Sequence, residues 1–167
     1  MSRAFLKNES ADDPVVIPAR APLPPGSINY VTPRGLALLR AELTDLEAEH
    51  AQVQLNAPDE TERTRQLALI NGKIGALNQR IRSAYVVNPA TQPHDEIRFS
   101  ATVTLRPKKG PERILTIVGV DEADASHGYV AFTAPIARAM QGKRSGDTVL
   151  LRTMKGEEEY VVAGVKY

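Results

Sequence analysis

Residues 36–53 read LALLRAELTDLEAEHAQV and residues 67–84 read LALINGKIGALNQRIRSA, and these two stretches decide the fold. Each one places apolar or weakly polar residues at alternating spacings of three and four, which is the heptad pattern of a coiled-coil seam. The seam positions are Leu36, Leu39, Leu43, Leu46, His50 and Val53 in the first stretch and Leu67, Ile70, Ile74, Leu77, Ile81 and Ala84 in the second. Because a short polar link with a proline joins the two helices, we expect them to fold back as an antiparallel hairpin.

Local sequence features indicate where the helices begin and where they are weak. Thr32 is suited to the N-cap and Pro33 to the first helical position, so the first helix is expected to cover residues 33–55. The second helix contains Gly72 and Gly75, which lower its helix propensity. These glycines are expected to allow either a close approach of the partner helix or a local bend.

The composition is typical of a globular protein, with 42% hydrophobic and 25% charged residues among 167. The absence of cysteine excludes disulfides and thiolate metal sites, and His50, His94 and His127 share no metal-ligand spacing. No apolar run approaches the roughly 20 residues of a membrane span, and no signal peptide is evident. We therefore expect a cytoplasmic protein without a membrane segment. The net charge of +1 gives no argument for direct nucleic-acid binding, which leaves a local patch or a protein partner.

The residues that flank the hairpin follow other patterns. The N-terminal residues are polar and rich in proline, which predicts a flexible tail, with a docking arm anchored by residues 3–7 as the alternative. After the hairpin, short alternating runs and turns predict a small antiparallel sheet with one short helix. The strands are expected over residues 98–105, 113–120, 129–132, 148–153 and 159–166. We therefore expect an α+β protein with four parts: a tail (residues 1–29), a coiled-coil hairpin (30–87), a linker (88–96) and a sheet domain (97–167).

Two motifs in the sheet domain are more specific than the strand pattern. Residues 117–124 read IVGVDEAD, and residues 134–143 read APIARAMQGK with Gly146-Asp147 after them. Together with the segment TPRG at residues 32–35, which precedes the leucine repeat, they resemble the bacterial GreA/GreB transcript elongation factors. The resemblance covers about residues 30–167, so the N-terminal tail lies outside it.

The resemblance implies a coiled coil followed by an FKBP-like domain, which agrees with the fold class that the residue patterns predict. It implies a monomer that is not itself an enzyme and has no cofactor of its own. Such a factor docks on RNA polymerase at the rim of the secondary channel, on the largest catalytic subunit, and reaches the nascent RNA only indirectly. Acidic residues at the coiled-coil tip then help to hold the second catalytic Mg²⁺ of the polymerase, which cleaves its own backtracked RNA. Carboxylates suit this role because Mg²⁺ prefers oxygen ligands.

The resemblance also assigns site residues. The tip acids are Asp59 and Glu62, whose D-x-x-E spacing places both carboxylates on one helical face. The polymerase-contacting residues are Thr133, Ala134, Pro135, Ile136, Ala137 and Arg138, together with the loop acids Asp121 and Glu122. Ala134 stands where the family usually has serine, so a hydroxyl is missing from this segment.

Alternatives to these assignments remain open because the tip departs from the family pattern. The family tip carries G-D-x-x-E-N-A-[DE]-Y, whereas residues 56–65 read NAPDETERTR, and each arm is shorter by about one heptad, or roughly 10 Å. Acids in a first helical turn are also favoured by the helix dipole alone, and the loop acids also fit a solvated turn. The alternative function is a regulator that occupies the same channel without stimulating cleavage. A prolyl isomerase is a third hypothesis, opposed by the few aromatic residues available to line a pocket.

Overall fold

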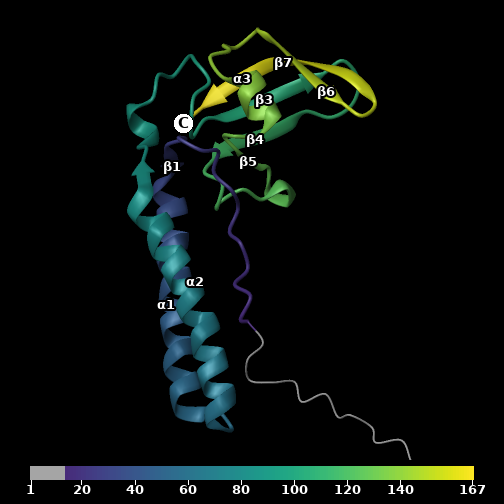
Figure 1. The fold of residues 1–167 in the computed structure, drawn as a ribbon. Helices are drawn as coiled ribbons and strands as arrows, with labels where there is room; N and C mark the ends of the chain where they lie inside the picture. Colours follow the sequence, from purple (N-terminus) through teal and green to yellow (C-terminus); the bar gives the residue numbers. More distant parts are fainter. Residues whose placement is uncertain (1–13) are drawn as a thin grey trace, which may run out of the picture.

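The computed structural model describes residues 14–167, which form a long helical hairpin and a sheet domain set at an angle to it (Figure 1). The hairpin consists of α1 (Pro33–Asn56) and α2 (Glu60–Ser83), each of 24 residues. At 1.5 Å per residue each arm is about 36 Å long. Within the described part of the chain, no helix is long and apolar enough to cross a membrane.

The residues buried between the two helices are those that the heptad pattern predicts. Every predicted seam position is buried or half-buried, and Leu39, Ile70 and Leu77 are at most 2% exposed. The start of α1 is also confirmed, because Thr32 Oγ1 accepts a hydrogen bond from the Gly35 amide at 2.9 Å and a proline follows at the first helical position. The deepest packing lies near the sheet domain, where Val31 joins Leu39 and Leu77 in one cluster.

The base of the hairpin carries a small parallel sheet that the sequence did not predict. It pairs β1 (Asn29–Val31) with β2 (Ala84–Val86). Segments of three residues are too short to show the two-residue period of a strand. The buried Asn29 side chain fixes this base by donating to Arg80 O at 3.0 Å and to Ser83 Oγ at 3.1 Å.

The sheet domain contains a five-stranded sheet in the order β5-β4-β3-β7-β6. Its elements are β3 (Thr102–Pro107), β4 (Arg113–Val118), β5 (Tyr129–Ala131), β6 (Thr148–Thr153) and β7 (Gly156–Lys166), with α3 (Pro135–Met140) and the short 3₁₀ turns η1 (Pro89–Thr91) and η2 (Ala125–His127). The core lies between α3 and the sheet and includes Ile97, Val103, Leu105, Ile117, Met140 and Val149, each at most 1% exposed.

Two details of the predicted sheet are wrong. The edge strand β5 pairs with β4 in parallel, so the sheet is mixed rather than wholly antiparallel. The connection over residues 119–128 is long enough to bring the chain back beside Thr116, so that β5 runs in the same direction as β4, whereas an antiparallel hairpin usually uses two to five residues. The first strand begins at Thr102 rather than at residue 98, because Ser100 has a φ of 72°, in the left-handed region that interrupts an extended run.

Residues 14–28 form an extended segment, the N-terminal strap, where the sequence predicts a flexible tail. The strap runs along the hairpin in the angle beneath the sheet domain (Figure 1). A Cβ atom on Gly72 would lie 1.9 Å from Ile17 Cδ1, so Gly72 admits the strap, not the partner helix. A proline-rich chain can stay extended without internal hydrogen bonds, so it can lie along the hairpin. Its local sequence does not show that it will do so. Residues 1–13 of the predicted tail, with the alternative docking arm, lie outside the described residues.

Candidate functional site

The tip of the hairpin places one exposed carboxylate at the start of α2. Asp59 is the N-cap of this helix, with extended φ and ψ of −146° and 169°, and its Oδ1 accepts a hydrogen bond from the Glu62 amide at 2.7 Å. Asp59 therefore lies just outside the helix, whereas the D-x-x-E spacing predicted that it would lie on a helical face. The hydrogen bond nevertheless holds its carboxylate against the first turn, close to the backbone of Glu62.

Glu62 lies within the first turn and is half-buried. Its Oε1 accepts a hydrogen bond from Gln66 Nε2 at 2.7 Å, one turn further along α2. Each tip acid thus uses one oxygen within the hairpin, while Asp59 Oδ2 and Glu62 Oε2 lie outside these bonds. Since a carboxylate has about four acceptor positions, the capping role leaves both acids able to bind a further partner.

The tip does not by itself form a complete metal site. In residues 14–167, no group of three or more His, Asp or Glu side chains is placed to hold a metal ion. Mg²⁺ takes about six oxygen ligands in octahedral geometry. Asp59 and Glu62 would supply only a minority of them, so a metal at the tip would need a partner to contribute the others.

The second candidate surface is the edge at the start of α3, formed by the half-buried Thr133 and Ala134 and by Pro135 and Arg138. Pro135 occupies the first helical position and is exposed, as is Arg138. Ala134 is the N-cap and makes no side-chain hydrogen bond, because alanine lacks the hydroxyl that serine would provide. We call these four residues the α3 edge.

Two predicted contact residues of this segment pack against the core. Ala137 is 2% exposed, and Ile136 is half-buried against the core cluster. Residues three apart lie on one face of a helix, so Ala137 and Met140 are buried together when α3 packs on the sheet. The prediction that Ala137 contacts a partner is therefore wrong, whereas the contact predicted for the half-buried Ile136 stays a prediction.

Glu122 belongs to the joint between the hairpin and the sheet domain, and the prediction that it contacts a partner is wrong. Its side chain is 3% exposed, accepts a hydrogen bond from Thr32 Oγ1 at 2.5 Å, and pairs with Arg34 Nη1 at 2.9 Å. Hydrogen bonding to Glu122 raises the pKa of Arg34. A Cβ atom on Gly35 would lie 2.7 Å from Glu122 Oε2, so the glycine lets the carboxylate approach α1. The TPRG segment at residues 32–35 and the IVGVDEAD motif at residues 117–124 thus meet at this joint.

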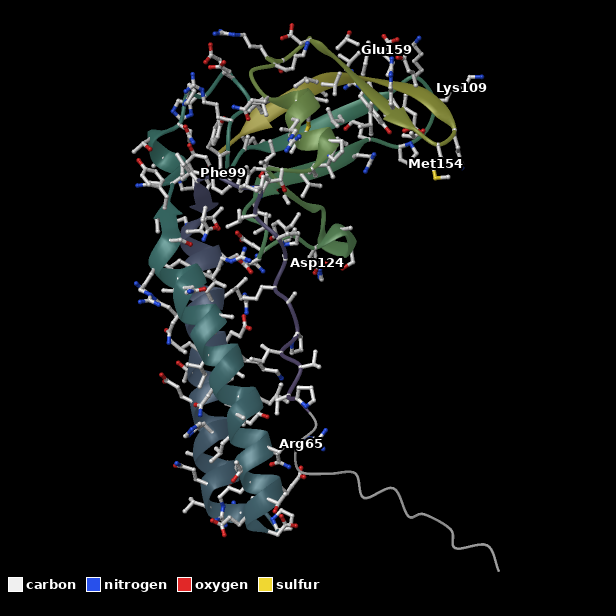
Figure 2. All side chains as sticks on the ribbon, in the orientation of Figure 1. Arg65, Phe99, Lys109, Asp124, Met154 and Glu159 are labelled. Carbon is white, nitrogen blue, oxygen red and sulfur yellow. The ribbon has the colours of Figure 1, made fainter. Side chains whose placement is uncertain are left out.

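Asp121 lies at the same joint and is 8% exposed, so it too is no surface contact. Its Oδ1 accepts from Arg20 Nη2 at 3.1 Å and its Oδ2 from Arg80 Nη1 at 3.2 Å. Arg20 also donates to Glu42 Oε1 at 2.7 Å, and the hydrogen bond to Glu42, followed by that to Asp121, raises the pKa of Arg20. In Figure 2, Asp124 marks the sheet domain on the inner side of the angle, and Arg65 lies on the hairpin near its tip.

Aromatic packing completes the joint, and sequence reasoning missed it. The Tyr30 ring lies 5.6 Å from that of Phe99, 5.5 Å from that of Phe132 and 5.7 Å from that of Tyr85, measured between centroids. Phe99 and Phe132 of the sheet domain therefore pack on a tyrosine from the hairpin base, and the three rings line a pocket together with Arg98 and Gln141.

Comparisons with known proteins find sequence relatives over most of the chain. The family model described as "Transcription elongation factor, GreA/GreB, C-term" matches residues 92–167. The transcription elongation factor GreA of Neisseria meningitidis serogroup B is 35% identical over 154 residues, which cover 82% of this chain and 96% of that protein. GreB of the same organism is 33% identical over 153 residues, which cover 83% of this chain and 94% of that protein.

Among solved structures, the prokaryotic transcription elongation factor GreA/GreB from Nitrosomonas europaea is similar over 83% of this chain and 98% of that chain, with 21% identity and a TM-score of 0.42. The two sequence relatives are matched over nearly their whole length, and both are transcription elongation factors. The chain belongs to the GreA/GreB family.

Proposed function

We propose that this chain binds RNA polymerase at the rim of the secondary channel, on the largest catalytic subunit, and stimulates cleavage of backtracked RNA by the polymerase. The observation that supports this most directly is the exposed carboxylate of Asp59, held by its bond to the Glu62 amide at the far end of a rigid hairpin. The two anchored helices, each about 36 Å long, would carry this carboxylate into a narrow channel. Such a factor acts in the cytoplasm as a monomer and is not itself an enzyme, because the polymerase carries out the cleavage.

The chemistry of phosphodiester hydrolysis explains why acids are needed at the tip. In two-metal sites the ions stabilise the attacking and leaving oxygens, and Mg²⁺ prefers oxygen ligands. Asp59 and Glu62 would complete the ligand shell of an ion that the polymerase holds by its other ligands. The factor then needs no cofactor of its own and acts on the nascent RNA only through the polymerase site.

The α3 edge is the proposed docking surface. A proline at the first helical position keeps this edge rigid, so it loses little conformational entropy on binding. Arg138 is exposed beside it and would pair with an acidic group of the polymerase. The functional surface thus consists of Thr133, Ala134, Pro135 and Arg138, without the core residues of the same segment.

The tip is tested by removing its charges while keeping its hydrogen bonds. Asparagine caps a helix about as well as aspartate, so Asp59→Asn with Glu62→Gln should leave the hairpin folded. Stimulated RNA cleavage on a backtracked polymerase complex should be lost, and affinity for the polymerase should be unchanged. Glu49→Gln, an exposed acid on α1, is the matched charge control and should keep full stimulation. If the wild-type chain gives no stimulation at saturation but slows nucleotide addition, the non-cleaving regulator is the correct function.

The docking surface is tested by Pro135→Glu. A central contact residue contributes about 2 kcal/mol or more, so polymerase affinity should fall by about 30-fold. Folding should change little, since glutamate is tolerated in a first helical turn. Pro111→Glu, an exposed turn residue of the same domain, is the control and should bind normally. Unchanged affinity of a folded Pro135→Glu variant would exclude the α3 edge as the docking surface.

A further inference from the structure

We propose that Arg20 of the N-terminal strap is a positioning residue that fixes the angle between the hairpin and the sheet domain. Through that angle it would set where the tip lies relative to the α3 edge. The first statement concerns the free protein, and only the second rests on the proposed function. The strap precedes residues 30–167, which carry the sequence resemblance to the family, so this device is a feature of this chain's own N-terminal segment.

Arg20 joins the two parts of the molecule with a single guanidinium group. Its Nη1 and Nη2 donate to Glu42 on α1 at 2.7 and 3.0 Å, and its Nε and Nη2 donate to Asp121 of the sheet domain at 3.3 and 3.1 Å. The planar fork of arginine suits such paired contacts, which fix direction as well as distance. Only 20% of the Arg20 side chain is exposed, so solvent screens these bonds less than those of a surface pair.

Arg80 links the strap and α2 to the same acid. It donates from Nη1 to Asp121 Oδ2 at 3.2 Å and from Nη2 to the carbonyl oxygen of Ala21. Asp121 thus receives one guanidinium from the strap and one from α2, and both helices are tied to the loop between β4 and β5. Loss of Arg20 would remove the link from Glu42 on α1 to this loop, while Asp121 stays paired with Arg80 and Glu122 with Arg34, so the variant should still fold.

The strap is anchored on both sides of Arg20, which allows it to act as a brace. On one side Ile17 fills the space above Gly72 on α2. On the other side the strap continues into β1, whose buried Asn29 is bonded to Arg80 O and Ser83 Oγ. Prolines between these anchors restrict the backbone, because each fixes its φ near −65°. They are Pro18, Pro22, Pro24 and Pro25.

The lever arm of the hairpin makes a small change of angle large at the tip. A rotation of about 10° at the joint moves the end of a 36 Å helix by about 6 Å. Metal ligands to Mg²⁺ lie at about 2.1 Å, and a displacement of about 1 Å in a reacting geometry is enough to lower a rate by roughly 100-fold. The angle at the joint therefore has to be held closely if the tip acids are to reach an ion.

The angle is measured in the free protein by the distance distribution between two spin labels. The chain has no native cysteine, so Glu49→Cys on α1 and Lys109→Cys in the sheet domain would be the only labelled sites, and both positions are exposed. Arg20→Ala should broaden and shift this distribution, and Arg20→Lys, which keeps the charge without the fork, should restore it in part. Arg106→Ala removes an exposed arginine–glutamate pair inside the sheet domain and should leave it unchanged. An identical distribution for Arg20→Ala and wild type would overturn the proposal.

The consequence for function is read from stimulated cleavage at increasing factor concentration. Arg20→Ala should lower the maximal rate and leave the half-saturating concentration nearly unchanged, because the docking edge is intact. A changed distance distribution with an unchanged maximal rate would overturn the link between the angle and the tip. If wild type itself failed to stimulate cleavage, the proposed function would fail, and the distance measurement would still decide whether Arg20 fixes the angle.

Discussion

Replacing Gly72 with alanine should reveal how firmly the strap is seated on α2. In a helix interior this change normally stabilises by about 1 kcal/mol, because alanine loses less backbone entropy than glycine. At Gly72 the new Cβ would lie 1.9 Å from Ile17 Cδ1 and 2.6 Å from Ile17 Cγ1, so Ile17 has to move away. Ile17 is 43% exposed. Full burial of isoleucine is worth about 1.5–3 kcal/mol, so losing its packing costs about 1 kcal/mol and cancels the gain.

Gly75 provides the matched control in the same helix. A Cβ atom there meets nothing within 4 Å, so Gly75→Ala should raise the free energy of unfolding by about 1 kcal/mol. Gly72→Ala should show this gain only together with Ile17→Ala, which removes the atoms that collide. The two positions should therefore show a coupling energy of about 1 kcal/mol in a double-mutant cycle.

The assay is denaturant unfolding of the full chain, followed by far-ultraviolet circular dichroism, for wild type, the three single variants and the double variant. Equal m-values would show that stability alone has changed. If Gly72→Ala stabilised the chain as much as Gly75→Ala while Ile17 was intact, the strap would not be seated on α2 and the reasoning would be refuted.

Three further predictions concern stability. Leu77→Ala, at a position that is 0% exposed, should lower the free energy of unfolding by about 2–5 kcal/mol, and a loss below about 1 kcal/mol would contradict the seam packing. Ala134→Ser should supply the missing N-cap of α3 and stabilise by about 1 kcal/mol, measured as a rise in melting temperature of about 2–4 °C. Burial raises the pKa of Tyr167, so its neutral hydroxyl stabilises the fold fully below the unfolded pKa of about 10, and this contribution is lost as the pH rises through the folded pKa. Alkaline unfolding should show that loss in wild type, whereas Tyr167→Phe should lack it.

The hairpin was predictable because its determinants are local. The heptad spacing of Leu39, Ile70 and Leu77 fixes which faces are buried, and Thr32 and Pro33 fix where α1 begins. Each of these features acts within one or two helical turns, so a single sequence contains the information. The position of α3 also depends on a local feature, because its first residue is Pro135 and proline suits the first helical position.

The joint was not predictable, because it depends on residues far apart in the chain. Asp121 pairs with Arg20 across 101 positions, and Glu122 pairs with Arg34 across 88. An acidic pair after a strand has the same local pattern whether it is solvated or buried against arginines. The strap is a similar case, since a proline-rich segment carries no period that shows which surface it will cover.

The candidate site was predictable in part. The sequence shows that the acids lie at the tip, because they stand in the link between the two helices. The N-cap conformation of Asp59 depends on the residue at which α2 begins, and the heptad pattern does not determine that boundary to within one residue. On α3, the motif does not separate the exposed Pro135 from the buried Ala137, because both belong to one run of apolar residues. Only the packing of α3 on the sheet divides the motif into a core face and an exposed edge.

The most direct test of the proposed function is the Mg²⁺ dependence of RNA cleavage by a backtracked polymerase complex, with and without this chain at saturation. If Asp59 and Glu62 supply ligands to a catalytic ion, the factor should raise the cleavage rate and lower the Mg²⁺ concentration needed for half-maximal rate. The Asp59→Asn, Glu62→Gln variant should bind the polymerase and return the Mg²⁺ dependence to that of the polymerase alone. A wild-type factor that binds at saturation and leaves both the rate and the Mg²⁺ dependence unchanged would contradict the account.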